Sequence, residues 1–181
     1  MYTQLYFHPI RRIYDIHLKD FLKGWLPGGF FPTTVQEHLE LTDNEVTASL
    51  CRAARDPGAP GHDPARRIIK RAHFKRLYEI NPADQAVNPD SVQCVFEAAV
   101  AQFGPDSVRR DAYAQKSMSL HFPVVDRDGR IQSSLAMSKT LQTVPTFAVD
   151  YVFIDPARQV EARRWLDDNR ASILQPRQEA E

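Results

Sequence analysis

The chain has 181 residues, of which 43% are hydrophobic, so it can form one ordinary core or two small subdomains that share an interface. Lys plus Arg and Asp plus Glu each total 23, and this zero net charge argues against a general nucleic-acid coat, while leaving room for a local basic site. The N-terminus lacks a signal-peptide pattern, and no apolar run approaches the roughly 20 residues that span a bilayer. Cys51 and Cys94 lie far apart without metal-ligand spacing, so we expect reduced, partly buried thiols in a cytoplasmic protein without membrane contact.

The first 75 residues have the periodicity of helices. Apolar residues recur at three- and four-residue steps between Ile10 and Trp25, which predicts one broad apolar helix face. Thr42 and Glu45 have the spacing of a capping box at the start of a later helix. The helices expected in this part cover about residues 10–25, 33–41, 42–55 and 63–74.

His62 and Asp63 form an adjacent pair that could hold a metal ion, as in HD hydrolases. The pair follows a Gly/Pro loop, and no separate His and Asp obviously complete a set of four ligands. We therefore expect Asp63 to be the N-cap of the next helix, with Pro64 at the first helical position. A small hydrolase built around a metal at His62 and Asp63 is the alternative.

From residue 76 onward the expected elements alternate between strands and helices. Strands are expected at about 76–80, 107–113, 119–125, 130–135 and 148–154, and helices at about 90–103, 137–143 and after Asp155-Pro156. This order resembles a split βαβ, ferredoxin-like arrangement. We therefore expect an α+β protein with a helical region at 1–75 and a ferredoxin-like lobe at 76–181, whose polar tail starts at about residue 175.

The segment from Arg66 to Arg76 holds six Lys or Arg residues, one His and no acidic residue. Arg67, Arg71 and Lys75 follow at four-residue steps, which would place them on one face of a helix. Such like charges repel each other, and a bound phosphate would relieve the repulsion through charge-assisted hydrogen bonds. The alternatives are a solvated helix face, pairing with acidic residues elsewhere in the chain, or a nucleic-acid-binding module that uses residues 66–76.

A second polar and aromatic cluster lies within residues 4–12. Tyr6 and His8 could stack on a base or hydrogen-bond a sugar, while Arg11 and Arg12 could hold phosphate. The alternative is that Tyr6 and Phe7 belong to the core and that both arginines are simply exposed.

Several segments share their order and spacing with one known family. They are Tyr6–Asp15, Leu41–Val46, Ala65–Tyr78, Val125–Gly129, Met137–Ser138 and Tyr151–Phe153. Together, over about residues 4–170, they resemble the C-terminal half of HD-domain deoxynucleoside triphosphate triphosphohydrolases.

The resemblance implies roles for individual residues. Tyr6 matches a tyrosine that lines the substrate pocket, and His8 falls near residues that contact nucleotide where subunits meet. Arg71 and Lys75 match basic residues that hold the phosphates of an allosteric nucleotide, a dNTP or GTP. The four-ligand metal set of the family is not in this chain, so the resemblance implies no cofactor here and a divalent metal only in the complete enzyme.

We therefore expect the C-terminal regulatory and oligomerisation portion of an HD-type dNTP or nucleotide phosphohydrolase, incomplete as a catalyst by itself. Its expected partners are a nucleotide and either further copies of the chain in a homo-oligomer or an HD-domain catalytic subunit. One alternative is a separately encoded assembly subunit without a ligand. Another is a nucleic-acid-binding module built on the basic residues 66–76.

Overall fold

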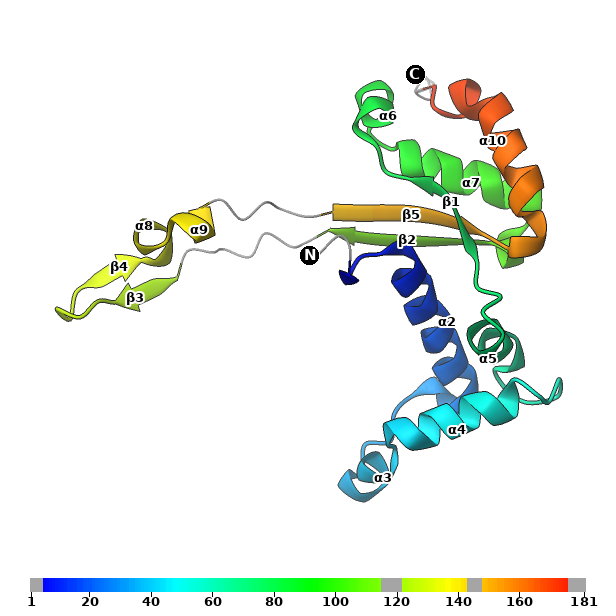
Figure 1. Cartoon of the computed structure of the whole chain (residues 1–181), viewed down its shortest axis with the longest axis horizontal. Coiled ribbons are helices and arrows are strands. Elements are labelled where there is room, and N and C mark those ends of the chain that lie inside the picture. The colour runs from blue at the N-terminus through cyan, green and yellow to red at the C-terminus, as the bar shows by residue number, and fades with distance from the viewer. Residues whose placement is uncertain (1–4, 115–121, 143–147, 176–181) are drawn as a thin grey trace. The chain divides into compact units, whose positions relative to one another are not determined.

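The structure is a computed structural model that describes residues 5–114, 122–142 and 148–175 (Figure 1). The chain divides into two compact units, one formed by residues 1–111 with 151–181 and the other by residues 112–150. Helices dominate the first part of the chain and a small antiparallel sheet follows, which confirms the expected α+β class. The expected division at residues 75–76 falls inside the first unit, at the start of its first strand, and stays a prediction.

The described elements have the following bounds. The helices are α2 (Pro9–Trp25), α3 (Val35–Glu40), α4 (Asp43–Ala53), α5 (His62–Ile69), α6 (Pro82–Val87), α7 (Ser91–Phe103), α8 (Ser134–Met137), α9 (Lys139–Gln142) and α10 (Gln159–Ile173). Three short 3-10 turns are η1 (Pro27–Gly29), η2 (Pro105–Ser107) and η3 (Pro156–Arg158). The strands are β1 (Lys75–Glu79), β2 (Val108–Ala114), β3 (Pro123–Val125), β4 (Ile131–Ser133) and β5 (Ala148–Ile154).

Helix α2 begins where the sequence predicts. The Nδ1 atom of His8 accepts a hydrogen bond from the Ile10 backbone N–H at 3.3 Å, and Pro9 occupies the first position, where no N–H is needed. The predicted apolar face is buried at its centre, at Ile13, His17 and Phe21. The helix therefore packs chiefly against α5, which in turn contacts α4.

Helix α4 also follows its signal, because the Thr42 hydroxyl accepts the Glu45 backbone N–H at 3.3 Å. The expected cap of α5 is wrong. Gly61, in the left-handed conformation at φ 74°, precedes the helix, and Asp63 lies within its first turn. A Cβ on Gly61 would lie 2.9 Å from the Phe21 ring, so the contact between α5 and α2 sets this start instead of a side-chain cap.

The end of α5 also differs from the prediction. The helix ends at Ile69, Arg71 takes φ 55°, and Lys75 already opens β1. Arg67, Arg71 and Lys75 therefore do not share a helix face. The reason is tertiary packing, because the chain turns here to bury Phe74, whose ring meets the edge of the His17 ring at 5.3 Å.

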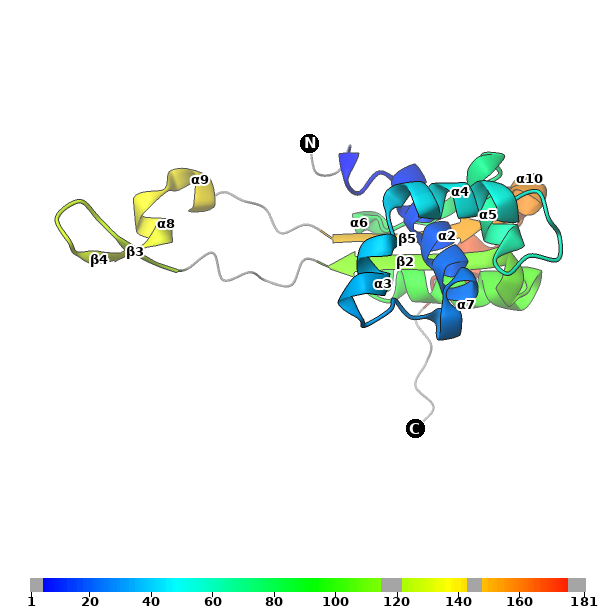
Figure 2. The same cartoon turned by 90° about the horizontal axis from the view of Figure 1, so that it is seen from below.

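The main sheet has the strand order β1-β5-β2. Strand β5 pairs antiparallel with β1, with Lys75 opposite Ile154, and runs opposite to β2 (Figure 2). Because the last strand lies between the first two and α7 connects those two, the expected split βαβ order is confirmed. The described residues after α10, which end at residue 175, add no fourth strand.

Helices α7 and α10 contact each other and both contact β1. The core between them is formed by the buried side chains of Tyr78, Val92, Val95, Ala99, Val108, Val152, Ile154, Ala162, Leu166 and Leu174. This core fixes β1, and with it the chain segment that leads from α5 into the sheet.

The unit of residues 112–150 contains an antiparallel hairpin of β3 and β4, with Val125 opposite Ile131. Its turn is the predicted one, in which the Asp126 carboxylate accepts the backbone N–H groups of Asp128 and Arg130. The expected helix near 137–143 is instead the pair α8 and α9. Residues 119–121, 143 and 176–181 lie outside the described residues. None of the described helices combines the length and apolar character that a bilayer crossing requires.

Candidate functional site

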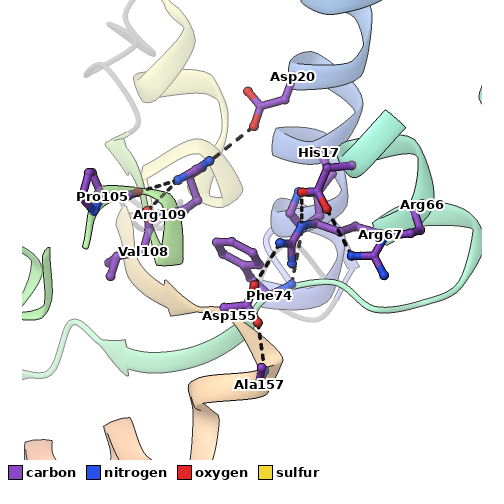
Figure 3. Close-up of polar contacts among 11 residues, drawn as sticks. His17, Asp20, Arg66, Arg67, Phe74, Pro105, Val108, Arg109, Asp155 and Ala157 are labelled. Atoms are coloured by element: carbon purple, nitrogen blue, oxygen red, sulfur yellow. Dashed lines mark hydrogen bonds and ion pairs between the residues drawn. The ribbon is translucent and has the colours of Figure 1, made fainter. Parts of the chain in front are cut away.

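Arg67 is held by two carboxylates and one aromatic ring (Figure 3). Its Nε lies 2.6 Å from Asp63 Oδ2, one terminal nitrogen lies 2.9 Å from Asp155 Oδ2, and the guanidinium carbon lies 4.4 Å from the Phe74 ring centre. Asp155 also caps η3 through the Ala157 N–H. Arg67 thus links α5 to the segment after β5, and its positive charge is balanced by protein carboxylates.

A polar cavity of about 580 Å³ adjoins Arg67. Its lining comprises His17, Asp20, Gly24, Gly61, Asp63, Pro64, Arg67, Phe74, Asp106 and Arg109. The Arg109 guanidinium lies 5.5 Å from the Phe74 ring centre and donates to the carbonyls of Pro105 and Val108 at 2.8 and 2.9 Å. Both arginines here are therefore committed to protein partners, so the cavity offers little spare positive charge.

His17 lies at the bottom of this cavity, as a neutral ring. Burial, followed by the charges of Arg67 and Arg109, lowers its pKa to about 4. Its Nε2 accepts the backbone N–H of Phe74 at 3.4 Å, a hydrogen bond that requires the unprotonated nitrogen.

Three cations of the basic segment have no carboxylate partner in the part of the chain that the structure describes. Arg66 pairs with Asp63 and Arg76 pairs with Glu79. Within the described residues, by contrast, no carboxylate lies within 4 Å of the Lys70, Arg71 or Lys75 side-chain nitrogens. We call residues 70–75 the basic loop.

The basic loop takes its shape from Arg71. Its positive φ of 55° is uncommon for a residue with a side chain, and it directs the chain away from α5. As a result Lys70 and Arg71 are exposed, whereas His73 and Phe74 are buried directly after them.

His73 joins the basic loop to α2. Its ring centre lies 4.9 Å from that of Tyr14, and its Nε2 lies 3.3 Å from Lys75 Nζ. Burial and then the charge of Lys75 lower the pKa of His73, while the nearby Arg71 carbonyl opposes the shift without forming a hydrogen bond. Because an ammonium can only donate, Nε2 is the acceptor and the buried Nδ1 carries the proton without a hydrogen-bond partner among the described residues.

The predicted residues near the N-terminus fall into two groups, His8 with Arg12 and Tyr6 with Arg11. In the first group, His8 caps α2 and Arg12 forms a bidentate ion pair with Asp111 at 2.5 and 2.6 Å, so both have structural partners. Arg11 is exposed, 3.9 Å from Asp15, and its guanidinium carbon lies 5.4 Å from the ring centre of the half-exposed Tyr6.

Arg11 shares a helix face with Tyr14, three residues further along α2. Through Tyr14 this face reaches His73 and therefore the basic loop. The structure thus places Tyr14, on the same α2 face as Arg11, against His73 of the basic loop. It also adds Lys70, His73 and Tyr14, which the sequence interpretation did not select. The sequence predicts a continuous helix over about residues 63–74. That prediction does not indicate that exposed residues are followed by buried ones within the basic loop.

His62 has a structural role. Its Nδ1 lies 2.8 Å from the Ala53 carbonyl and ties the start of α5 to the end of α4. No group of three or more metal-ligating side chains occurs in the part of the chain that the structure describes. The metal site that would support the small-hydrolase alternative is therefore not found among these residues.

Comparisons with known proteins bear on the fold alone. No family model and no curated protein matches the sequence. A hypothetical protein from Aquifex aeolicus superposes with a TM-score of 0.72 at 24% identity, over 92% of this chain and 42% of that one. A phosphohydrolase from Bacteroides thetaiotaomicron aligns with a TM-score of 0.47 at 14% identity, over 86% and 47% of the two chains.

The Aquifex protein shares this fold, whereas the second likeness is too weak to carry an argument. This chain spans less than half the length of either protein.

Proposed function

We propose that this chain is the C-terminal regulatory and oligomerisation part of an HD-type nucleotide phosphohydrolase, and that its basic loop binds the phosphates of a dNTP or GTP. One observation carries the proposal. Lys70, Arg71 and Lys75 lie within six residues of one another, and no carboxylate among the described residues lies within 4 Å of their charged groups.

Phosphate is the chemical complement of this loop. A guanidinium such as that of Arg71 can form two parallel hydrogen bonds to phosphate, and a lysine ammonium acts as a point charge. Lys75 is anchored by the neutral His73 ring, which accepts one of its three N–H groups and leaves two for a ligand. Bound phosphate would also remove the mutual repulsion of the three cations.

The other predicted residues enter the proposal differently. Arg12 and Arg67 are not included as phosphate ligands, because carboxylates hold both guanidinium groups. Arg11 and Tyr6 are the candidates for contacts with the base or sugar, since they contact each other and Arg11 shares its α2 face with Tyr14, which contacts His73. The substrate-pocket role of Tyr6 and the nucleotide contact of His8 stay predictions.

The family resemblance implies a divalent metal only in the complete enzyme, and the described residues of this chain contain no set of three metal-ligating side chains. We therefore assign no catalytic step to this chain. The proposed contribution is the recognition of phosphate and contacts between subunits.

The test is a thermal melt of the full chain with millimolar GTP or dATP. A ligand that binds only the folded state stabilises it by about 1.4 kcal/mol at ten times its Kd, and the melting temperature should rise accordingly. The double variant Arg71→Ala/Lys75→Ala should lose this rise. The control Arg66→Ala/Arg76→Ala removes the same charge from residues that already have carboxylate partners, and it should keep the rise. A wild-type melt unchanged by nucleotide would refute the proposal.

The assembly module without a ligand is the second candidate, and one observation favours it. Lys70 and Arg71 follow the C-terminal end of α5, where the helix dipole stabilises cations without any ligand. This candidate predicts no nucleotide response in any variant. A nucleic-acid module would instead bind duplex DNA or RNA with a log–log salt slope near −0.9 for each phosphate contacted.

A further inference from the structure

Two hollows lie side by side near the end of α2, and Leu26 and Phe31 line both of them. The first, of about 720 Å³, lies between the end of α2 and α3, and the second, of about 370 Å³, lies along α2. We call this surface the α2–α3 groove. All of it belongs to the first compact unit.

The groove and α3 expose large apolar side chains. The exposed fractions are 79% for Phe30, 50% for Phe31, 75% for Val35 and 69% for Leu39. Single exposed apolar residues are normal on a protein surface, whereas a cluster within ten residues of chain marks a site of association.

Charges are segregated along the groove. Glu37 and Glu40 line the first hollow, where their hydrogen-bond donors are the neutral side chains of Thr34 and Gln36. Lys19 and Lys23 line the second hollow together with Asp15, whose carboxylate pairs with Arg11 at 3.9 Å. In the described part of the chain, none of Glu37, Glu40, Lys19 and Lys23 has an oppositely charged group within 4 Å. An acidic rim and a basic rim therefore flank the shared residues Leu26 and Phe31.

We propose that the α2–α3 groove is the contact surface of a two-fold dimer of this chain. In a two-fold contact the same surface of each copy faces its counterpart. A residue on one side of the axis in the first copy therefore meets the residues on the other side of the axis in the second copy. With the axis near Leu26 and Phe31, the apolar residues meet at the centre. The acidic rim of each copy then meets the basic rim of the other, twice.

This charge pattern selects a second copy as the occupant. A partner that is purely basic would complement the hollow with Glu37 and Glu40 but would be repelled by Lys19 and Lys23, and a purely acidic partner would meet the reverse. A two-fold copy satisfies both rims without any other chain. The inference does not depend on phosphate binding by the basic loop, so either can fail alone.

Sedimentation velocity of the full chain tests the contact. The wild type should form dimers at micromolar concentration, and Phe30→Ser should weaken them at least tenfold, since a two-fold contact loses the side chain twice. The control Val160→Ser removes an apolar side chain of similar exposure from α10 and should leave the dimer intact. A wild type that remains monomeric at about 100 μM, or a dimer unaffected by Phe30→Ser, would overturn the inference.

Charge reversal distinguishes this surface from any other dimer contact. The variants Lys19→Glu/Lys23→Glu and Glu37→Lys/Glu40→Lys should each be monomeric, because like charges face each other across the axis. A mixture of the two variants should form mixed dimers, and the quadruple variant should form dimers with itself. Dimers in both single-rim variants, or no pairing in the mixture and in the quadruple variant, would contradict the proposed two-fold contact.

Discussion

Arg12 and Asp111 join α2 to β2 through two short hydrogen bonds, and the Asp111 side chain is only 9% exposed. Asp111→Asn removes the negative charge that these two hydrogen bonds bring to the largely buried Arg12 guanidinium. We expect the free energy of unfolding to fall by about 2–3 kcal/mol in urea titrations. The control Glu161→Gln breaks an exposed pair with Arg158 and should cost less than about 0.5 kcal/mol. Equal losses in the two variants would show that the Arg12–Asp111 pair has no special role.

His17 should make stability depend on pH. Its pKa of about 4 lies below the ordinary value of 6.5, so between these two values the unfolded chain takes up a proton that the folded chain does not. The free energy of unfolding should therefore fall as pH drops from 6.5 towards 4, by at most about 1.4 kcal/mol per pH unit from this group. Urea titrations at pH 7 and pH 5 should show a smaller difference in His17→Gln than in the wild type. The same difference in both proteins would refute this assignment.

For single residues, the sequence shows which side chains are charged but does not show which residues they form ion pairs with. The basic segment is visible in the sequence, and the phosphate-binding role of Arg71 and Lys75 stays a prediction. The partners of Arg12 and Arg67 were not predictable, because Asp111 and Asp155 lie far away along the chain. Only the fold shows which of these arginines are already neutralised.

The start of helix α5 depends on the close approach of Gly61 to Phe21 in helix α2. Gly61 has φ 74°, and a Cβ there would lie 2.9 Å from the Phe21 ring. Gly61→Ala should therefore lower the melting temperature through both backbone strain and overlap, at a cost of about 2–4 kcal/mol. Gly28→Ala is the matched control, because Gly28 has a similar left-handed backbone (φ 65°, ψ 4°) and an added Cβ would meet only the Phe30 side chain, at 3.9 Å. It should cost only about 1–2 kcal/mol, and an equal loss would exclude the packing contribution.

Elements with strong local signals were predictable. The capping box of α4, the glycine stop after α7 and the β-branched and aromatic run of β5 all lie where the sequence indicates. The end of α5 was not predictable, because the burial of Phe74 overrides a favourable helical pattern. Helix α6 was missed although Asn81 caps it through the Asp84 N–H at 3.0 Å.

The whole molecule consists of two units of very different packing. The unit of residues 112–150 contains a two-stranded hairpin, and its described residues expose Phe122, Val125, Ile131 and Met137. Two strands alone are marginally stable in water. Amide hydrogens of β3 and β4 should therefore exchange through low-energy local opening, well before those of β1 and the buried half of β5. Equal protection of the two sets by hydrogen-exchange mass spectrometry would contradict this expectation.

The strand order was predictable at this scale because a split βαβ follows from the sequence of elements. The division into units was not, since the strands β2 and β5 extend across it. The candidate site likewise could be predicted only in part. Its cations are visible in the sequence, but the contact of His73 with Tyr14 of α2 is formed only in the folded chain.

The most direct test of nucleotide recognition by the basic loop is an NMR titration of the ¹⁵N-labelled full chain with GTP. The proposal predicts saturable shifts of the backbone amides in residues 70–75 and around Arg11 and Tyr14, and their loss in Arg71→Ala/Lys75→Ala. Unchanged amides in these two segments at millimolar nucleotide, or the same shifts in the double variant, would contradict it.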